Sequence, residues 1–208
     1  MSTIPGKRGK AGEILLSEDR VWILGGDHGD ISTYVCSPST GCQAYVDLPG
    51  WPSQPRVVRV DERRIFVLPN GYVSGNVSKS YIFDQVDETW SLLPDMPYPM
   101  FYTTVGLVNG HDVVVVGGRN RESYIFDLNT NLWRQGPDLP SGRKMGAGVQ
   151  YQNSFFFVGG KNGHSQKTDT IFWLNPDDYK FETLPQRLPL PLVDAAAFLI
   201  PDDFIACS

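Results

Sequence analysis

The sequence predicts an all-β protein built from a repeated four-stranded unit, and three observations support this prediction. Similar segments recur along the chain at a spacing of about 43 residues, as Trp90 and Trp133 illustrate. Short apolar runs end at turn-forming residues. No segment shows the 3.6-residue apolar period of a long helix. Repeats of this length with four strands each are typical of propeller blades, which radiate from a central axis.

The strands of one unit can be assigned from their residue types. The clearest unit begins with an expected strand at 103–108 and continues with four valines at 113–116, which suit a strand buried on both faces. A glycine pair at 117–118 ends this strand, because glycine allows positive φ and close backbone packing. A polar loop leads to a third strand at 124–127, and Trp133 marks the fourth.

The same order of elements predicts four complete blades and the beginning of a fifth, about four and a half in all. The blades are expected at 12–49, 55–97, 102–140, 145–185 and, in part, 194–208. Because closure protects the terminal edges of a propeller, this set predicts a partial, unclosed ring: a fragment, a truncated product or a chain that needs another copy. Residues 1–11 are expected to be a disordered lead-in without the apolar core of a secretory signal.

These elements resemble the kelch repeat, whose blade has a glycine pair after its second strand, a third strand of Tyr-x-x-Asp type and a Trp in its fourth strand. The matching residues are the glycine pairs 25–26, 117–118 and 159–160, the segments 81–84 and 124–127, and Trp90 and Trp133. Pro69 and Asn70 replace the glycine pair in the second unit, Tyr45 replaces Trp in the first, and Trp173 replaces Asp in the fourth. The Gly-His to Trp-Asp pairing of a WD repeat is absent from the sequence.

Composition and charge exclude several classes of partner. The formal net charge is −5 and the pI is about 5.1, which argues against a nucleic-acid or anionic membrane partner. The longest apolar runs are much shorter than a membrane-spanning helix requires. The three cysteines, without a signal peptide, favour reduced thiols in a cytoplasmic protein. Cys36 and Cys42 flank a turn, however, and a bridge between them is geometrically conceivable.

The sequence contains no recognisable catalytic arrangement. The glycine pairs are not followed by a P-loop lysine or a helix, so they do not predict a phosphate site. His28 and His164 occupy equivalent loops, but a metal site would need three or four ligands, and exposed loop residues are the better interpretation. No nucleophile, base and orienting group can be assembled. We therefore expect no enzymatic activity, no cofactor and no metal.

The candidate binding residues lie in loops and crossovers that a propeller places at one end. Loops on a rigid scaffold are the usual place for recognition, and arginines with aromatic residues are typical of protein-binding hot spots. An acidic peptide or loop is the expected partner by charge complementarity. The alternative is that many of these side chains pack against a neighbouring blade or are only solvated. The candidates are Arg119, Asn120, Arg121, Lys161 and His164 in loops, and Tyr98, Phe101, Tyr102, Arg143 and Lys144 in crossovers.

Several functions remain open at this stage. The resemblance implies a non-catalytic protein–protein interaction module, such as a scaffold or the substrate-recognition propeller of a ubiquitin-ligase adaptor. The first alternative is a secreted, carbohydrate-directed propeller, either lectin-like or an enzyme related to mutarotases or oxidases; the glycosylation sequon at 76–78 and a paired Cys36 and Cys42 would suit it. The second alternative is an actin-binding scaffold. Self-association of the unclosed ring is also possible.

Overall fold

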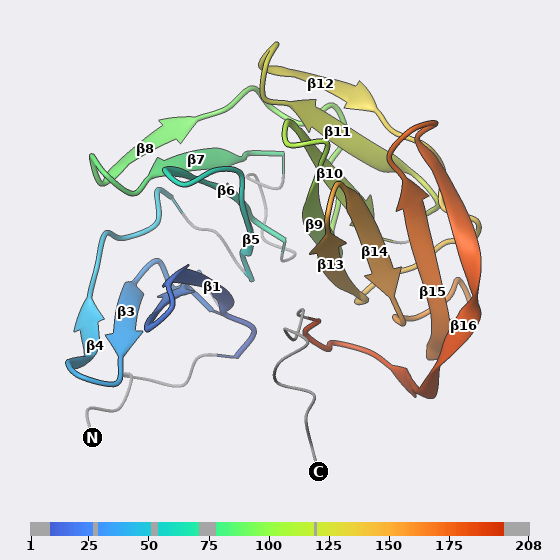
Figure 1. Cartoon of the computed structure of the whole chain (residues 1–208), viewed down its shortest axis with the longest axis horizontal. Coiled ribbons are helices and arrows are strands. Elements are labelled where there is room, and N and C mark those ends of the chain that lie inside the picture. Colours follow the sequence, from blue (N-terminus) through green and yellow to red (C-terminus); the bar gives the residue numbers. More distant parts are fainter. Residues whose placement is uncertain (1–8, 27–28, 51–53, 71–77, 119, 198–208) are drawn as a thin grey trace.

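The protein is an all-β propeller. The structure, a computed structural model, describes residues 9–26, 29–50, 54–70, 78–118 and 120–197. Within these residues every regular element is a β-strand, and the strands form four four-stranded antiparallel sheets arranged as propeller blades (Figure 1). The predicted all-β fold is confirmed.

Each blade is a simple meander in which strands adjacent in sequence are adjacent in the sheet. The first blade contains β1 (Gly12–Ser17), β2 (Arg20–Leu24), β3 (Thr33–Ser37) and β4 (Gly41–Ala44). The second contains β5 (Arg56–Arg59), β6 (Arg64–Leu68), β7 (Tyr81–Asp84) and β8 (Thr89–Leu92). The third contains β9 (Thr103–Val108), β10 (Asp112–Gly117), β11 (Ser123–Asp127) and β12 (Leu132–Gln135). The fourth contains β13 (Ala147–Tyr151), β14 (Ser154–Val158), β15 (Thr168–Asn175) and β16 (Lys180–Leu192).

The described blades follow one another in an arc (Figure 1). Extensive contacts join the inner strands β1 to β5, β5 to β9 and β9 to β13. Among the described strands, no comparable contact joins β13 to β1. Residues 193–197 form no strand, and 198–208, the rest of the expected fifth blade, lie outside the described residues, as do 1–8 of the expected lead-in.

Apolar packing between blades explains why the central strands are apolar on both faces. In β10, Val113 and Val115 pack in the cluster shared with the second blade, whereas Val114 and Val116 pack in the cluster shared with the fourth. Successive side chains of a strand point to opposite faces, so a strand covered on both sides needs a continuous apolar run. A third cluster joins the first two blades around Trp22, which is fully buried.

The tryptophans of the outer strands connect consecutive blades. The indole N–H of Trp90 in β8 donates a hydrogen bond to the carbonyl oxygen of Asp47 at 2.9 Å, in the crossover that leaves the first blade. The indole N–H of Trp133 in β12 donates to the carbonyl oxygen of Pro94 at 2.8 Å, in the crossover that leaves the second blade. The repeated tryptophan therefore joins each of these blades to the one before it.

We expect Trp133→Phe to lower the free energy of unfolding by about 1 kcal/mol, because it keeps a ring but removes the donor to Pro94. Trp133→Ala should cost about 3 kcal/mol, since it also removes the ring packed on Phe126, whose centroid lies 5.1 Å away. Urea titrations followed by circular dichroism measure both values. Equal losses in the two variants would contradict a packing role for the ring.

Asn70 compensates for the missing glycine pair of the second blade. Its side-chain oxygen accepts hydrogen bonds from the backbone N–H of Thr103 at 2.5 Å and from the Thr103 hydroxyl at 2.7 Å. Both residues are fully buried, and the Asn70 carbonyl also accepts from the N–H of Tyr102. The departure from the repeat pattern therefore ties the second blade to the start of the third.

Asn70→Gly restores the glycine of the repeat pattern, but we expect it to destabilise the protein by about 2 kcal/mol. The reason is that the buried N–H and hydroxyl of Thr103 lose their acceptor. Ser80→Ala is a matched control, because Ser80 is also buried in this blade and its hydroxyl has no hydrogen-bond partner. Thermal unfolding of both variants tests this; a stabilised Asn70→Gly protein would contradict it.

The fourth blade is longer than the sequence pattern indicates. The pattern ends this blade at residue 185, whereas β16 continues to Leu192 and pairs with β15 as far as Thr168. The prolines at 185, 189 and 191 suggest a crossover, but β16 is an outer strand, and proline is tolerated on a sheet edge. Register irregularities on both sides of Thr170 accommodate the extra residues.

The structure corrects the expectation of reduced cysteines. Cys36 in β3 and Cys42 in β4 are directly opposite each other and form a disulfide. The three-residue turn at 38–40 sets this register, which the cysteine count does not reveal. The expectation of a cytoplasmic location rested on reduced thiols. Because Cys36 and Cys42 are bonded, these two residues no longer support it.

We expect one free thiol, that of Cys207, when the unreduced protein is denatured, and three after reduction. Because the bridge closes a short loop, its reduction should lower the free energy of unfolding by about 2 kcal/mol. Thiol titration in denaturant and urea unfolding with and without reductant measure these effects. Three thiols titrating without reductant would contradict the disulfide.

Candidate protein-binding face

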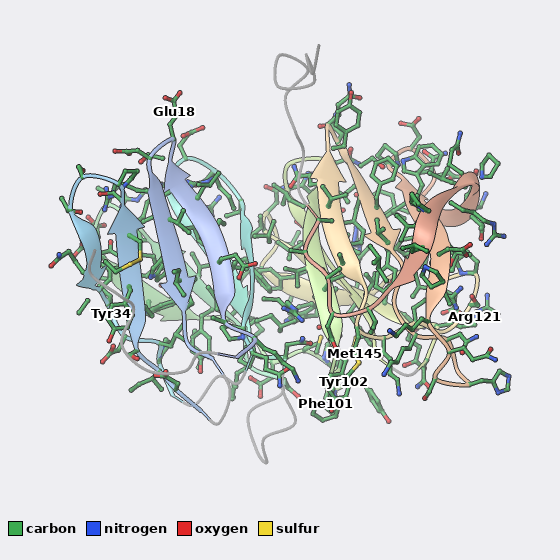
Figure 2. All side chains as sticks on the ribbon, turned by 90° about the horizontal axis from the view of Figure 1, so that it is seen from below. Glu18, Tyr34, Phe101, Tyr102, Arg121 and Met145 are labelled. Atoms are coloured by element: carbon green, nitrogen blue, oxygen red, sulfur yellow. A yellow bond between two sulfur atoms is a disulfide. The ribbon has the colours of Figure 1, made fainter. Side chains whose placement is uncertain are left out.

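The candidate residues gather at one end of the propeller. Figure 2 shows Phe101, Tyr102, Met145 and Arg121 at the same end, whereas Glu18, in the turn between β1 and β2, lies at the opposite end. The antiparallel meander produces this arrangement, because loops from second to third strands and crossovers between blades share one side. We call this end the loop face and define it by residues 98–102, 117–118, 120–122, 142–145 and 160–167.

Three lysines form a row on the loop face. Lys144 pairs with Lys161 in an antiparallel bridge, and Lys161 pairs with Lys167 in a second one. Two backbone hydrogen bonds, at 3.1 and 2.8 Å, connect Lys144 and Lys161. Residues directly opposite in antiparallel strands extend their side chains to the same side. The segments preceding the fourth blade and following β14 therefore place three lysines at opposed backbone positions, which we call the lysine row.

The lysine row is electrostatically unfavourable in isolation. Like charges directly opposite one another destabilise a pair of strands. Every ion pair among the described residues uses other side chains, so no described carboxylate oxygen lies within 4.0 Å of a Lys144, Lys161 or Lys167 ammonium nitrogen. The protein as a whole carries a net charge of −5, so this concentration of positive charge is local. Such an arrangement favours an acidic ligand, whose negative charge would relieve the repulsion.

A polar cavity of about 300 Å³ lies at the lysine row. Lys144 and Lys161 line it together with Gly118, Asn162, Gly163 and Ser165. Asn162 organises the loop: its side-chain oxygen accepts hydrogen bonds from the backbone N–H groups of His164 and Gln166, both at 3.0 Å. The loop therefore presents a defined surface, while its glycine leaves open space beside the backbone.

A second cavity, of about 440 Å³, lies beside the first. We call it the aromatic groove; it is lined by Tyr98, Pro99, Met100, Phe101, Tyr102, Gly117, Gly118, Asn120 and Glu122. Tyr98 is 56% exposed, whereas Met100 is buried. Gly117 and Gly118 have φ values of 110° and 86°, and a Cβ on Gly118 would lie only 3.3 Å from the Phe101 carbonyl oxygen. The glycine pair thus lets the crossover approach closely, and Gly118 lines both cavities.

The structure separates the predicted residues into accessible and occupied groups. Asn120 and His164 are exposed, Phe101 and Tyr102 are half-buried, and Arg119 lies outside the described residues, as does His28. Arg121 is exposed, but its Nε donates a hydrogen bond to the carbonyl oxygen of Leu139 at 2.6 Å. This contact ties the Arg121 side chain to the crossover of its own blade.

Arg143 lies inside the blade rather than on its rim. It is 6% exposed, its guanidinium carbon lies 4.9 Å from the centroid of the Phe172 ring, and its Nη2 donates to the Thr170 hydroxyl at 2.9 Å. Burial lowers the pKa of this guanidinium, which stays charged because arginine is not deprotonated in proteins. The geometry therefore gives Arg143 a packing role, which corrects its expected place among exposed binding residues.

Lys167 is the residue that sequence reasoning missed. It follows the loop and is exposed, but its position beside Lys161 arises only from the backbone bridge. The length of the loop between Lys161 and Lys167 does not indicate that these two residues pair. The cluster of Lys161, Asn162 and Gly163 after a glycine pair was the available sequence signal for the site.

The axis of the propeller holds another polar cavity, of about 430 Å³. Its walls come mainly from the inner strands and include Glu13, Arg56 and Asp194 among small residues. Burial lowers the pKa of Arg56, while the charges of Glu13 and Asp194 oppose this effect. The Arg56 Nε also donates to the carbonyl oxygen of Thr103 at 3.1 Å. Opposite charges are thus balanced here, unlike in the lysine row.

The described part of the chain offers neither a metal-binding cluster nor a membrane-spanning helix. No three or more side chains of His, Cys, Asp or Glu lie together in a way that would hold a metal ion. No helix of these residues is long and apolar enough to cross a membrane.

Comparison with known proteins supports the fold. No protein-family model and no curated protein matches the sequence. Among solved structures, that of YjhT matches with a TM-score of 0.73 and 17% sequence identity, covering 90% of this chain and 68% of the YjhT chain. At this identity the similarity establishes the fold alone. The chain is thus similar to a longer protein across about two thirds of that protein's length.

Proposed function

We propose that this protein is a non-catalytic interaction module of kelch type that binds an acidic segment of a partner protein through its loop face. The observation that carries the proposal is the lysine row, in which Lys144, Lys161 and Lys167 lie side by side without a carboxylate partner among the described residues. A partner's carboxylates would neutralise charges that the fold itself leaves unpaired. A scaffold or substrate-recognition role suits this activity.

The repeat pattern supports the kelch assignment. The glycine pairs at 117–118 and 159–160 adopt positive φ, and Trp90 and Trp133 make equivalent contacts to preceding blades. Each motif therefore has a structural task that recurs from blade to blade. An interaction module also needs only a rigid frame and exposed loops, both of which the propeller supplies.

The expected affinity is strongly dependent on salt. Exposed ion pairs contribute about 0.2–1 kcal/mol each, and charges near a protein surface are screened within about 8 Å at physiological ionic strength. Three lysines acting together therefore provide a modest, salt-sensitive contribution. Binding by the lysine row should weaken as salt is raised.

A fluorescein-labelled peptide of alternating Glu and Gly residues tests the proposal by fluorescence anisotropy at low salt. We expect the double variant Lys144→Glu with Lys161→Glu to weaken binding at least about tenfold, because two attractive charges become repulsive. Lys180→Glu is the matched control: Lys180 is exposed, is the first residue of β16 and pairs with Asp178. Its binding should stay close to that of the unchanged protein.

Two results would contradict the proposal. An equal loss in Lys180→Glu would indicate a response to net charge rather than to the lysine row. Absence of any binding of the acidic peptide to the unchanged protein would overturn the assignment of the loop face.

The disulfide favours a second candidate function. Bonded Cys36 and Cys42 suit an oxidising compartment, and a secreted carbohydrate-directed propeller would occupy one. Residues 76 and 77 of the sequon lie outside the described residues, which resume at Ser78. Glycan-array binding tests this candidate: selective binding to one class of glycan, unchanged in the double lysine variant, would favour it over the interaction module.

A further inference from the structure

We propose that the acidic segment bound by the loop face carries a large apolar side chain, aromatic or branched aliphatic, that enters the aromatic groove beside the lysine row. This inference rests on the proposed function and specifies the partner's recognition motif. Its starting point is that two cavities of different chemistry meet at one residue, Gly118, which lines both.

The two cavities have complementary chemical preferences. One is lined by Lys144 and Lys161, whereas the other is lined by Tyr98, Phe101 and Tyr102. Aromatic residues in a pocket beside charged residues form the typical anchor of a peptide interface. Volumes of about 300 and 440 Å³ allow a few side chains in each cavity.

Charge determines which part of the partner goes to which cavity. Glu122 lines the aromatic groove, so a carboxylate placed there would meet a like charge. The same carboxylate at the lysine row would meet unpaired ammonium groups. A segment with both acidic and apolar residues therefore fits in one orientation, with its apolar anchor at Tyr98 and its carboxylates at Lys144 and Lys161.

The backbone fixes the distance between the two cavities. The N–H of Met145, adjacent to Lys144, donates a hydrogen bond to the carbonyl oxygen of Tyr102 at 3.0 Å. The N–H of Tyr102 donates in turn to the carbonyl oxygen of Asn70 at 3.2 Å. The groove wall and the lysine row are thus attached to each other directly, and Figure 2 shows Phe101, Tyr102 and Met145 close to one another at this end. Rigid spacing favours a short, continuous motif.

Three labelled peptides of equal length separate the two contributions. The first contains four Glu residues and a central Trp, the second has Ala in place of Trp, and the third keeps Trp but has Gln in place of each Glu. We expect the first peptide to bind about tenfold more tightly than the second, since a few buried anchors, enriched in Trp and Tyr, supply most of the binding energy of an interface. The third should bind more weakly than the first, because it lacks the charges that the lysine row selects.

Matched tyrosine variants locate the anchor. Tyr98→Ala should remove the preference for Trp over Ala, while leaving the affinity for the second peptide nearly unchanged. Tyr151→Ala is the control, because Tyr151 is a tyrosine of similar exposure, 49% against 56%, at the end of β13 away from the groove. It should leave the preference intact.

Each outcome has a distinct meaning. Acidic peptides that bind without any preference for Trp, or a preference that survives Tyr98→Ala, would overturn the groove inference while leaving the proposed function standing. Failure of both acidic peptides to bind would overturn the proposed function and, with it, this inference. Equal binding of the first and third peptides would show that the lysine row does not select the partner and would likewise overturn the paired motif.

Discussion

Apolar packing between successive blades is the constraint on which the rest of this structure depends. A four-stranded sheet with two apolar faces is not stable alone, so each internal blade must be covered by a neighbour on both sides. The valines of β10 divide between two clusters because β10 lies between two such neighbours. The hydrophobic effect is not directional. The hydrogen bonds that Trp90 and Trp133 donate to the preceding blades add directional contacts between consecutive blades.

The crossovers connect the packed interfaces between blades to the loop face. They must leave one blade at its outer strand and enter the next at its inner strand, so their backbones pass over the buried clusters at one end. Close approach is possible because Gly117 and Gly118 carry no Cβ, and it is reinforced by hydrogen bonds such as that from Met145 to Tyr102. The same contacts that stabilise the interface between blades therefore hold the loops of the loop face in place.

Within this rigid frame, the lysine row is a local electrostatic conflict, because it places like charges opposite one another. Several exposed charges of the described chain lie near an opposite charge, as Lys79 does with Asp95 and Lys180 with Asp178. Lys144, Lys161 and Lys167 instead lie opposite one another. Local conflicts of this kind in an otherwise consistent fold tend to coincide with functional sites, because binding relieves them. The charges near Arg56 differ from the lysine row, because carboxylates of Glu13 and Asp194 act on that guanidinium.

From the sequence alone, the repeat length, the strand order and the all-β class were predictable, because turn residues and apolar runs act over a few neighbouring positions. The glycine pairs, the tryptophans and the shared end of the loops follow from that repetition. Tertiary structure decided what depends on partners distant in sequence: the burial of Arg143 against Phe172, the acceptor role of Asn70 toward Thr103 and the alignment of Lys167 with Lys161. It also decided the pairing of Cys36 with Cys42, since strand register places the two residues opposite each other. Side-chain type indicates what a residue is able to do, but only the packed neighbours determine whether it is free to do it.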